Sequence, residues 1–350
     1  MGILHRIHAR HAARVWEAET RILHRLGWVR PPVAVQWIVT HACDLTCPHC
    51  YSHAGPRLSG ELTTDEAKRL VIDELVALGC PSLVLAGGEL FLRKDLPALI
   101  EYAHARGVGW AMHTHGRLVP RHRDLIRRCP PQMAAVSLDG PPDFHDRFRG
   151  RAGAFDDAVR AIRCLRECGV TDVVAGTTVT SRNADLVADT FPHVVESGAT
   201  SWGLHLFAPE GRGEEHRALF PSADQLRRVA AFAHRKRAHF KVELDNEWGS
   251  AGEADLLYRD QPFLCGAGRI TCVVSATGEL MPCTTTDPAE SAGNVREVPL
   301  SILWRRGFSA FRKGGGACSD GRECWLQSRN GNACRHLAFP DHVPLAEARP

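Results

Sequence analysis

The sequence has no apolar stretch long enough to span a bilayer and no long block of one charge sign. Its 43 Lys and Arg residues against 40 Asp and Glu give a formal net charge of +3, which argues against a dedicated nucleic-acid or membrane-surface protein. Residues 1 to 30 carry Arg and His throughout, without the apolar core or small-residue cleavage site of a secretory signal. We therefore expect a cytoplasmic protein with no nucleic-acid or membrane partner.

Cysteine, by contrast, is plentiful. The 13 cysteines are odd in number and lie in short clusters within a 350-residue chain, which does not suit a disulfide framework. In a reducing compartment such clusters bind metal more often than they form disulfide bonds. We expect iron or zinc.

Three of these cysteines, Cys43, Cys47 and Cys50, lie within eight residues, directly after the apolar run Val33 to Val39. Four thiolates would complete a tetrahedral zinc site or an ordinary iron-sulfur cluster. Three leave one metal position open to a group that is not protein. The spacing therefore predicts a metal centre that binds a substrate or a cofactor, with a structural zinc loop as the alternative.

From residue 33 to about 238, short β-rich runs alternate with longer helical patterns. The pattern predicts strands at 33–40, 82–86, 109–113, 133–138, 172–180 and 201–207, and helices at 63–79, 94–107, 120–129, 154–168, 183–198 and 222–238. This alternation implies parallel strands with right-handed crossovers, and the six repeats suit a partial (β/α)6 TIM-type barrel of the α/β class. The Cys43 loop falls at the carboxyl end of the first strand, where such folds place their sites.

Two further regions flank the predicted barrel, which we place at 33–240. Residues 1–32 form an amphipathic helical extension, ended by Gly27 and two prolines. In 241–350, Gly, Cys and Pro become frequent and helical periodicity fades, so we predict a small Cys-rich C-terminal domain. It begins with a hairpin of residues 273–275 and 279–281 around a turn at Gly278.

The Cys-x3-Cys-x2-Cys motif after a first strand resembles the cluster motif of the radical S-adenosylmethionine (SAM) enzymes. The likeness implies that Cys43, Cys47 and Cys50 hold a [4Fe-4S] cluster whose open iron chelates SAM. Several segments carry it further, over roughly 33 to 335, and imply the SAM contacts: a Gly-Gly-Glu segment for the methionine amino group, Ser137 and Asp139 near the ribose, and His49 near the adenine. The contact residues are thus His49, Gly87, Gly88, Glu89, Ser137 and Asp139.

Two positions depart from the family pattern. Leu90 stands where relatives commonly have Pro after Gly-Gly-Glu, and His115 stands where many have Asn. Neither change removes a cluster ligand. They affect how substrate or cofactor is positioned and leave the reaction class unaltered.

The C-terminal cysteines resemble the ligand pattern of SPASM and twitch domains, which carry auxiliary iron-sulfur clusters. Six thiolates are too few for two fully Cys-ligated [4Fe-4S] clusters, so we expect at least one auxiliary cluster, with zinc as the alternative. The preferred ligands are Cys265, Cys283, Cys324 and Cys334, with Cys272 and Cys318 as further ligands or spares.

The remaining cysteines are interpreted as small buried hydrophobes: Cys80, Cys129, Cys164 and Cys168. Three histidines near predicted strand ends face the expected cavity, where one can relay a proton or make an ordinary polar contact: His113, His115 and His205.

The resemblance implies a radical SAM oxidoreductase that forms a 5′-deoxyadenosyl radical and takes hydrogen from its substrate. Most SPASM relatives modify peptides, so we expect a maturase that oxidises or cross-links a ribosomally made peptide. Its partners would be a one-electron donor such as flavodoxin or ferredoxin and a separate leader-binding protein. The alternatives are a small-molecule dehydrogenase, a tetrapyrrole side-chain enzyme, or a non-catalytic iron-sulfur electron carrier.

Overall fold

The computed structural model describes residues 19, 22–245, 248, 255–260, 265–284, 286 and 288–313. Most of the predicted N-terminal extension lies outside this range. So do three of the predicted auxiliary ligands, Cys318, Cys324 and Cys334.

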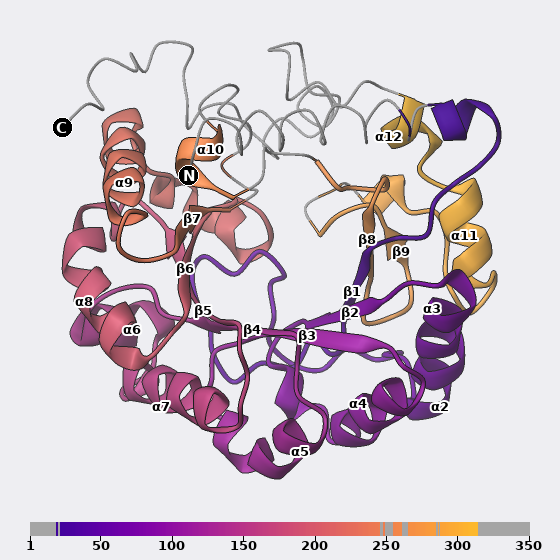
Figure 1. Cartoon of the computed structure of the whole chain (residues 1–350), viewed down its shortest axis with the longest axis horizontal. Helices are drawn as coiled ribbons and strands as arrows, with labels where there is room; N and C mark the ends of the chain where they lie inside the picture. Colours follow the sequence, from indigo (N-terminus) through magenta and orange to yellow (C-terminus); the bar gives the residue numbers. More distant parts are fainter. Residues whose placement is uncertain are drawn as a thin grey trace.

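The described chain forms a curved nine-stranded sheet in the order β7-β6-β5-β4-β3-β2-β1-β8-β9. Every neighbouring pair is parallel except β8 and β9. Figure 1 shows the sheet bent into an open curve, with helices outside it and the segment after β1 inside it. The strands are β1 (Ala34–Ile38), β2 (Ser82–Ala86), β3 (Gly109–Thr114), β4 (Met133–Ser137), β5 (Val173–Val179), β6 (Ser201–Leu206), β7 (Val242–Leu244), β8 (Thr271–Val274) and β9 (Leu280–Met281). The prediction of a partial, unclosed α/β barrel is confirmed.

The helices follow the strands as a parallel sheet requires. They are α2 (Thr64–Glu66), α3 (Asp73–Leu78), α4 (Leu96–Ala105), α5 (Arg123–Arg128), α6 (Pro142–Arg149), α7 (Ala154–Glu167), α8 (Val187–Ser197), α9 (Ala223–Lys236), α10 (Asp255–Tyr258), α11 (Leu300–Arg306) and α12 (Ser309–Lys313). A π-helical segment, Ala67–Ile72, joins α2 to α3, so the three form one continuous helical stretch. None of the described helices is long and apolar enough to cross a membrane.

The first helical stretch begins and ends where its sequence directs. Thr63 accepts a hydrogen bond from the Glu66 backbone while the Glu66 carboxylate accepts one from the Thr63 backbone, a complete capping box. At the other end Gly79 adopts φ +70°, a left-handed conformation that favours glycine. These local signals fix the crossover that brings β2 beside β1.

The core lies between the sheet and its outer helices. The indoles of Trp37, Trp110 and Trp202 are almost fully buried there. The Trp110 indole donates to the Cys129 carbonyl and the Trp202 indole to the Thr177 hydroxyl, so these two buried N–H groups are satisfied. The concave face differs, because small residues such as Ala86, Ala135 and Gly176, together with polar side chains, line a cavity there.

Several elements were not predicted. Strand β7 has only three residues, α6 covers a stretch that sequence periodicity left unassigned, and α10, α11 and α12 lie beyond residue 240, where no helix was expected. The predicted C-terminal hairpin is confirmed as β8 and β9, and β8 pairs with β1 to extend the barrel sheet. The first part of the region assigned to a C-terminal domain is thus continuous with the barrel. The domain boundary near residue 240 stays a prediction.

Candidate functional site

The three clustered cysteines lie on the loop that follows β1, at the carboxyl edge of the sheet. The Cys43 amide donates to the Gly55 carbonyl at 2.8 Å, and the Gly55 amide donates to the His41 carbonyl at 3.0 Å, which closes the loop on itself. A cavity of about 280 Å³ lies beneath it. Of the cysteines that the structure describes, only Cys43, Cys47 and Cys50 line this cavity.

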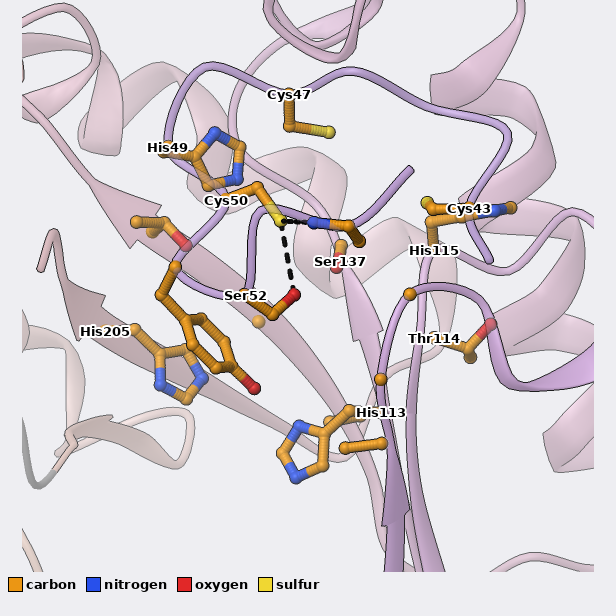
Figure 2. A pocket seen from close by; sticks show the side chains of 18 of the residues that line it. Cys43, Cys47, His49, Cys50, Ser52, His113, Thr114, His115, Ser137 and His205 are labelled. Atoms are coloured by element: carbon orange, nitrogen blue, oxygen red, sulfur yellow. Dashed lines mark hydrogen bonds between the residues drawn. The ribbon is translucent and has the colours of Figure 1, made fainter. Parts of the chain in front are cut away.

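The three thiols suit a metal cluster and not isolated reactive cysteines. Burial raises the pKa of Cys43 to about 11 and raises the pKa of Cys47, so without a metal these groups stay protonated. The Cys50 sulfur lies within hydrogen-bond distance of the Ser52 hydroxyl and the Ala54 amide, at 3.4 Å each (Figure 2). Three convergent sulfurs with no fourth cysteine on the cavity wall match an under-ligated cluster.

The carboxylate of Glu89 is fully buried beside this cavity. It accepts hydrogen bonds from the Thr114 hydroxyl at 2.8 and 3.0 Å and from the His115 amide at 3.1 Å. Strands β2 and β3, which end here side by side, therefore hold the carboxylate in one orientation. A fixed carboxylate at this edge suits an amino group of a bound ligand.

Gly87 and Gly88 pack directly against the backbone of the cysteine loop. A Cβ on Gly87 would collide with the Thr40 carbonyl, and one on Gly88 with the Ala42 carbonyl. The Gly88 amide donates to the Thr40 carbonyl at 2.9 Å, and the Glu89 amide donates to the Ala42 carbonyl at 2.7 Å. The two glycines also line the cavity, so they place the loop as well as leave room for a ligand.

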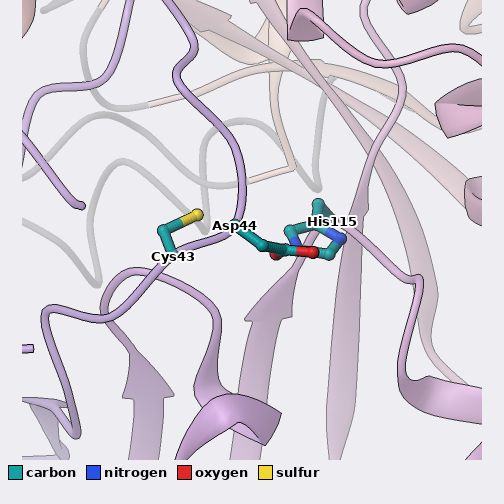
Figure 3. A group of neighbouring side chains, drawn as sticks. All are labelled: Cys43, Asp44 and His115. Carbon is teal, nitrogen blue, oxygen red and sulfur yellow. The ribbon is translucent and has the colours of Figure 1, made fainter. Parts of the chain in front are cut away.

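His115 joins the carboxylate of Glu89 to the cysteine loop. Its Nε2 atom lies 2.9 Å from Asp44 Oδ1 and 3.3 Å from Glu89 Oε2, and Arg117 pairs with the other Asp44 oxygen. The hydrogen bond from His115, followed by the charges of His115 and Arg117, outweighs burial and lowers the pKa of Asp44 to about 2. Cys43, Asp44 and His115 lie close enough to offer ligand atoms to one ion (Figure 3), but the Asp44 carboxylate is already shared between His115 and Arg117.

Ser137 and Asp139, predicted together near a ribose, have different positions. Ser137 lines the cavity, whereas the fully buried Asp139 accepts from Arg149 Nε at 2.5 Å and from the Thr178 amide at 3.0 Å. Burial raises the pKa of Asp139, but the charge of Arg149 and the neighbouring histidines outweigh it and lower the pKa to about 2. The Asp139 carboxylate is thus a permanent anion that orients Arg149.

Arg149 is a site residue that sequence reasoning missed. It lies on the cavity wall at the end of α6, and its Nη1 atom is 3.7 Å from the Cys47 sulfur. Burial opposes the charged form, yet Asp139 and Cys47 raise the pKa of Arg149 overall. The stretch Asp146 to Gly150 also resembles the radical SAM pattern, and it is the sequence signal that could have identified Arg149. A guanidinium here can bind a carboxylate of a ligand.

His49 stacks on Phe148 with ring centroids 4.5 Å apart and lines the cavity (Figure 2). Burial, reinforced by the charge of Arg149, lowers the pKa of His49 to about 3, so the imidazole is neutral. Its Nδ1 atom is buried without a hydrogen-bond partner. An orphaned polar atom on the wall of a cavity is what a bound ligand with polar ring atoms would satisfy.

Two predicted histidines lie on the sheet side of the cavity. His113 from β3 and His205 from β6 both line the cavity (Figure 2). The His205 Nδ1 atom lies 3.1 Å from Asp245 Oδ2, and its Nε2 edge lies over Gly176 and Gly203. The loop that follows β6 contributes Ala208 to the cavity wall.

The auxiliary cysteines are brought together only in part. Cys265 and Cys283 are half-buried and lie near each other in the fold, since the Gly268 amide donates to the Pro282 carbonyl at 3.2 Å. Cys272 is fully buried in β8. Burial, followed by the neighbouring Cys80, raises the pKa of Cys272 strongly. Its thiol belongs to the hydrophobic core.

Comparison with known proteins agrees with this geometry. Residues 37–185 match the radical SAM superfamily, and residues 265–325 match the SPASM iron-sulfur cluster-binding domain. The AdoMet-dependent heme synthase of Nitratidesulfovibrio vulgaris is 31% identical over 299 residues, which is 79% of this chain and 80% of that protein. The mycofactocin maturase MftC of Mycobacterium tuberculosis is 31% identical over 338 residues, covering 90% and 81%.

A solved structure also shares the fold. Streptococcus suis SuiB bound to S-adenosylmethionine superposes with a TM-score of 0.64 at 14% identity, covering 80% of this chain and 68% of SuiB. With two family models and relatives matched over most of their length, the chain belongs to the radical SAM superfamily with a SPASM domain, and its cofactors are a SAM-binding [4Fe-4S] cluster, SAM and auxiliary iron-sulfur clusters.

Proposed function

We propose that Cys43, Cys47 and Cys50 hold the SAM-binding cluster and that SAM lies in the adjoining cavity. The observation that carries this assignment is that three cysteines, one buried and two half-buried, line one cavity with no fourth cysteine among its described lining residues. Glu89 is proposed to contact the amino group of SAM and Arg149 its carboxylate. Gly87, Gly88 and Ser137 line the ligand, and Asp139 acts through Arg149.

When bound, the cluster and SAM supply a 5′-deoxyadenosyl radical that takes a hydrogen atom from the substrate. The chain must keep water and unwanted hydrogen donors away from this radical. The curved sheet does so by surrounding the cavity, with His49 stacked over one side and small residues such as Ala135 on the floor. His113 and His205 line the cavity from the sheet side, where they can bind polar groups of a substrate.

The proposed substrate is a ribosomally made peptide, which the enzyme oxidises or cross-links in the cytoplasm. The support is the similarity to mycofactocin maturase over 90% of the chain. After the peptide has lost a hydrogen atom, an auxiliary cluster would accept the electron that the peptide radical gives up, so the peptide undergoes a net two-electron oxidation. A flavodoxin or ferredoxin would deliver the electron that cleavage of SAM consumes. A separate protein would present the leader peptide.

The test is anaerobic turnover of the reconstituted enzyme with SAM and a peptide encoded beside it. We expect 5′-deoxyadenosine to form in step with a peptide that has lost two hydrogen atoms. The Cys47→Ala variant is the matched negative control. Formation of 5′-deoxyadenosine only with a small metabolite, and never with the peptide, would contradict this proposal.

A second candidate is oxidation of a tetrapyrrole side chain. The specific observation in its favour is the similarity to AdoMet-dependent heme synthase over 80% of that protein. The same assay, run with an iron coproporphyrin in place of the peptide, separates the two. A non-catalytic electron carrier would yield no 5′-deoxyadenosine with either substrate, and alcohol dehydrogenation would require a small alcohol.

For the auxiliary centre, we propose Cys265 and Cys283 as ligands together with Cys324 and Cys334, and Cys318 as a further candidate. The proximity of the Cys265 and Cys283 segments supports the first pair. The complete burial of Cys272 in β8 favours the alternative in which it is a core residue and not a ligand. Iron and sulfide analysis of single Cys→Ala variants tests each position.

A further inference from the structure

The loop that follows β6 packs against the cysteine loop. Arg212 supplies three hydrogen bonds between them. Its backbone amide donates to the Cys50 carbonyl at 3.0 Å, its Nη1 to the Cys47 carbonyl at 3.0 Å, and its Nη2 to the Ala54 carbonyl at 2.5 Å. One residue thereby brackets the stretch from Cys47 to Ala54 at both ends and in the middle.

Gly211 makes this approach possible. It adopts φ +56°, and a Cβ at this position would collide with the Tyr51 carbonyl. A residue with a side chain would therefore be strained in its backbone and would push the two loops apart. The glycine brings the Arg212 backbone within hydrogen-bond distance of Cys50.

The two halves of the cysteine loop are held by different parts of the fold. The Cys43 half is tied to the segment after β2, because the Glu89 amide donates to the Ala42 carbonyl at 2.7 Å, and the Cys43 amide closes the loop by donating to the Gly55 carbonyl at 2.8 Å. The Cys47 and Cys50 half receives its contacts from Arg212 and from the Arg149 guanidinium, 3.7 Å from the Cys47 sulfur. The relative placement of the three sulfurs thus depends on a residue far along the chain.

We propose that Arg212 is a positioning residue, which sets Cys47 and Cys50 relative to Cys43 and thereby fixes the orientation of the cluster toward SAM. The proposal rests on the assignment of these three cysteines as cluster ligands. A guanidinium suits the task because its planar fork reaches two carbonyl oxygens at once, whereas an ammonium acts as a single compact donor. The loop that follows β6 also contributes Ala208 to the cavity wall, so it borders the proposed SAM and substrate cavity.

The experiment measures SAM binding to anaerobically reconstituted, full-length protein and needs no substrate. The variants are Arg212→Gln and Arg212→Lys, and the matched control is Arg217→Gln, an exposed residue of the same loop with the same charge change. Three readouts are taken: the dissociation constant for SAM, the change that SAM causes in the electron paramagnetic resonance spectrum of the reduced cluster, and the thermal unfolding midpoint.

We expect Arg212→Gln to weaken SAM binding by about tenfold or more and to diminish the spectral change, because two charge-assisted hydrogen bonds are lost. Arg212→Lys should resemble Arg212→Gln, and Arg217→Gln should match the wild type. Wild-type affinity and spectra in Arg212→Gln would overturn the proposal, as would full restoration by lysine, which would show that charge alone suffices. If Arg212→Gln does not fold, the lysine variant decides by the same criteria.

The assignment on which this depends is tested separately. A variant with Cys43, Cys47 and Cys50 all changed to Ala should lose the SAM-dependent spectral change altogether. If it retains the change, the ligand assignment is wrong. If it loses the change while Arg212→Gln behaves as wild type, only the positioning role is refuted.

Discussion

The ion pair between Arg149 and Asp139 should be the most sensitive polar contact near the site. Asp139 is fully buried, and its charged partner Arg149 lies on the cavity wall. Replacing Arg149 with Gln leaves the carboxylate its 3.0 Å hydrogen bond from the Thr178 amide but removes the neighbouring charge. Removing one partner of a buried pair costs about 3–5 kcal/mol of unfolding free energy, since an uncompensated charge remains.

The double variant with Asp139→Asn tests this cause. With both charges gone, only imperfectly hydrogen-bonded polar groups remain, and these lower the unfolding free energy by about 1–3 kcal/mol. The Arg149→Gln and Asp139→Asn costs should therefore sum to more than the cost of the double variant. The measurement is urea denaturation of the four proteins under identical anaerobic conditions. Single costs that add to the double cost within about 0.5 kcal/mol would refute the reasoning.

The pH dependence supplies an independent check with a definite sign. In the wild type the lowered pKa of Asp139, about 2, gives stability that is fully present above the unfolded value near 3.8 and is lost as the pH falls toward 2. In Arg149→Gln burial dominates and raises the pKa of Asp139, so protonation of Asp139 at low pH removes the unpaired buried charge that destabilises the variant. The stability gap between the two proteins should narrow as the pH falls from 7 to 4, and a constant gap would contradict the mechanism.

Three further outcomes are expected. Burial lowers the pKa of His145 to about 4, so as the pH falls the unfolded chain binds a proton at this imidazole before the folded chain does. Between pH 7 and pH 5 the unfolding free energy of the wild type, measured in urea titrations, should therefore fall by about 2 kcal/mol more than that of His145→Asn. Gly88→Ala should lower cluster occupancy, measured as iron bound, because its Cβ would collide with the Ala42 carbonyl. Cys272→Ala should keep wild-type iron and sulfide content and cost about 1 kcal/mol, whereas loss of iron would make Cys272 a ligand.

Sequence patterns located the strands well because buried parallel strands are apolar runs bounded by turn residues. The run predicted at 133–138 is β4, Met133–Ser137, and the run predicted at 82–86 is β2. Strand β7 escaped notice because Val242–Leu244 is too short to show a period. Its place in the sheet comes from pairing with β6, which no local pattern encodes.

The candidate site likewise contains residues that local sequence identifies and residues that only the fold brings together. The motif cysteines and Glu89 could be identified because each belongs to a short local motif, Cys43 to Cys50 and Gly87 to Glu89. Arg149 and Arg212 reach Cys47 from 102 and 165 residues away, and their contacts follow from how α6 and the β6 loop fold back. Asp139 shows the complementary limit: its residue type suited a ligand hydroxyl, but the structure commits its oxygens to Arg149 and Thr178.

The pairing of β8 with β1 has a consequence for any attempt to study the barrel alone. A chain cut near residue 240 would lose the strand that registers Ala34 to Trp37 against Thr271 to Val274. Strand β1 would then become an exposed edge strand, whose unpaired backbone groups can pair with another chain, directly before the cysteine loop. Such a fragment should self-associate, so β8 protects the edge of β1 as well as extending the sheet.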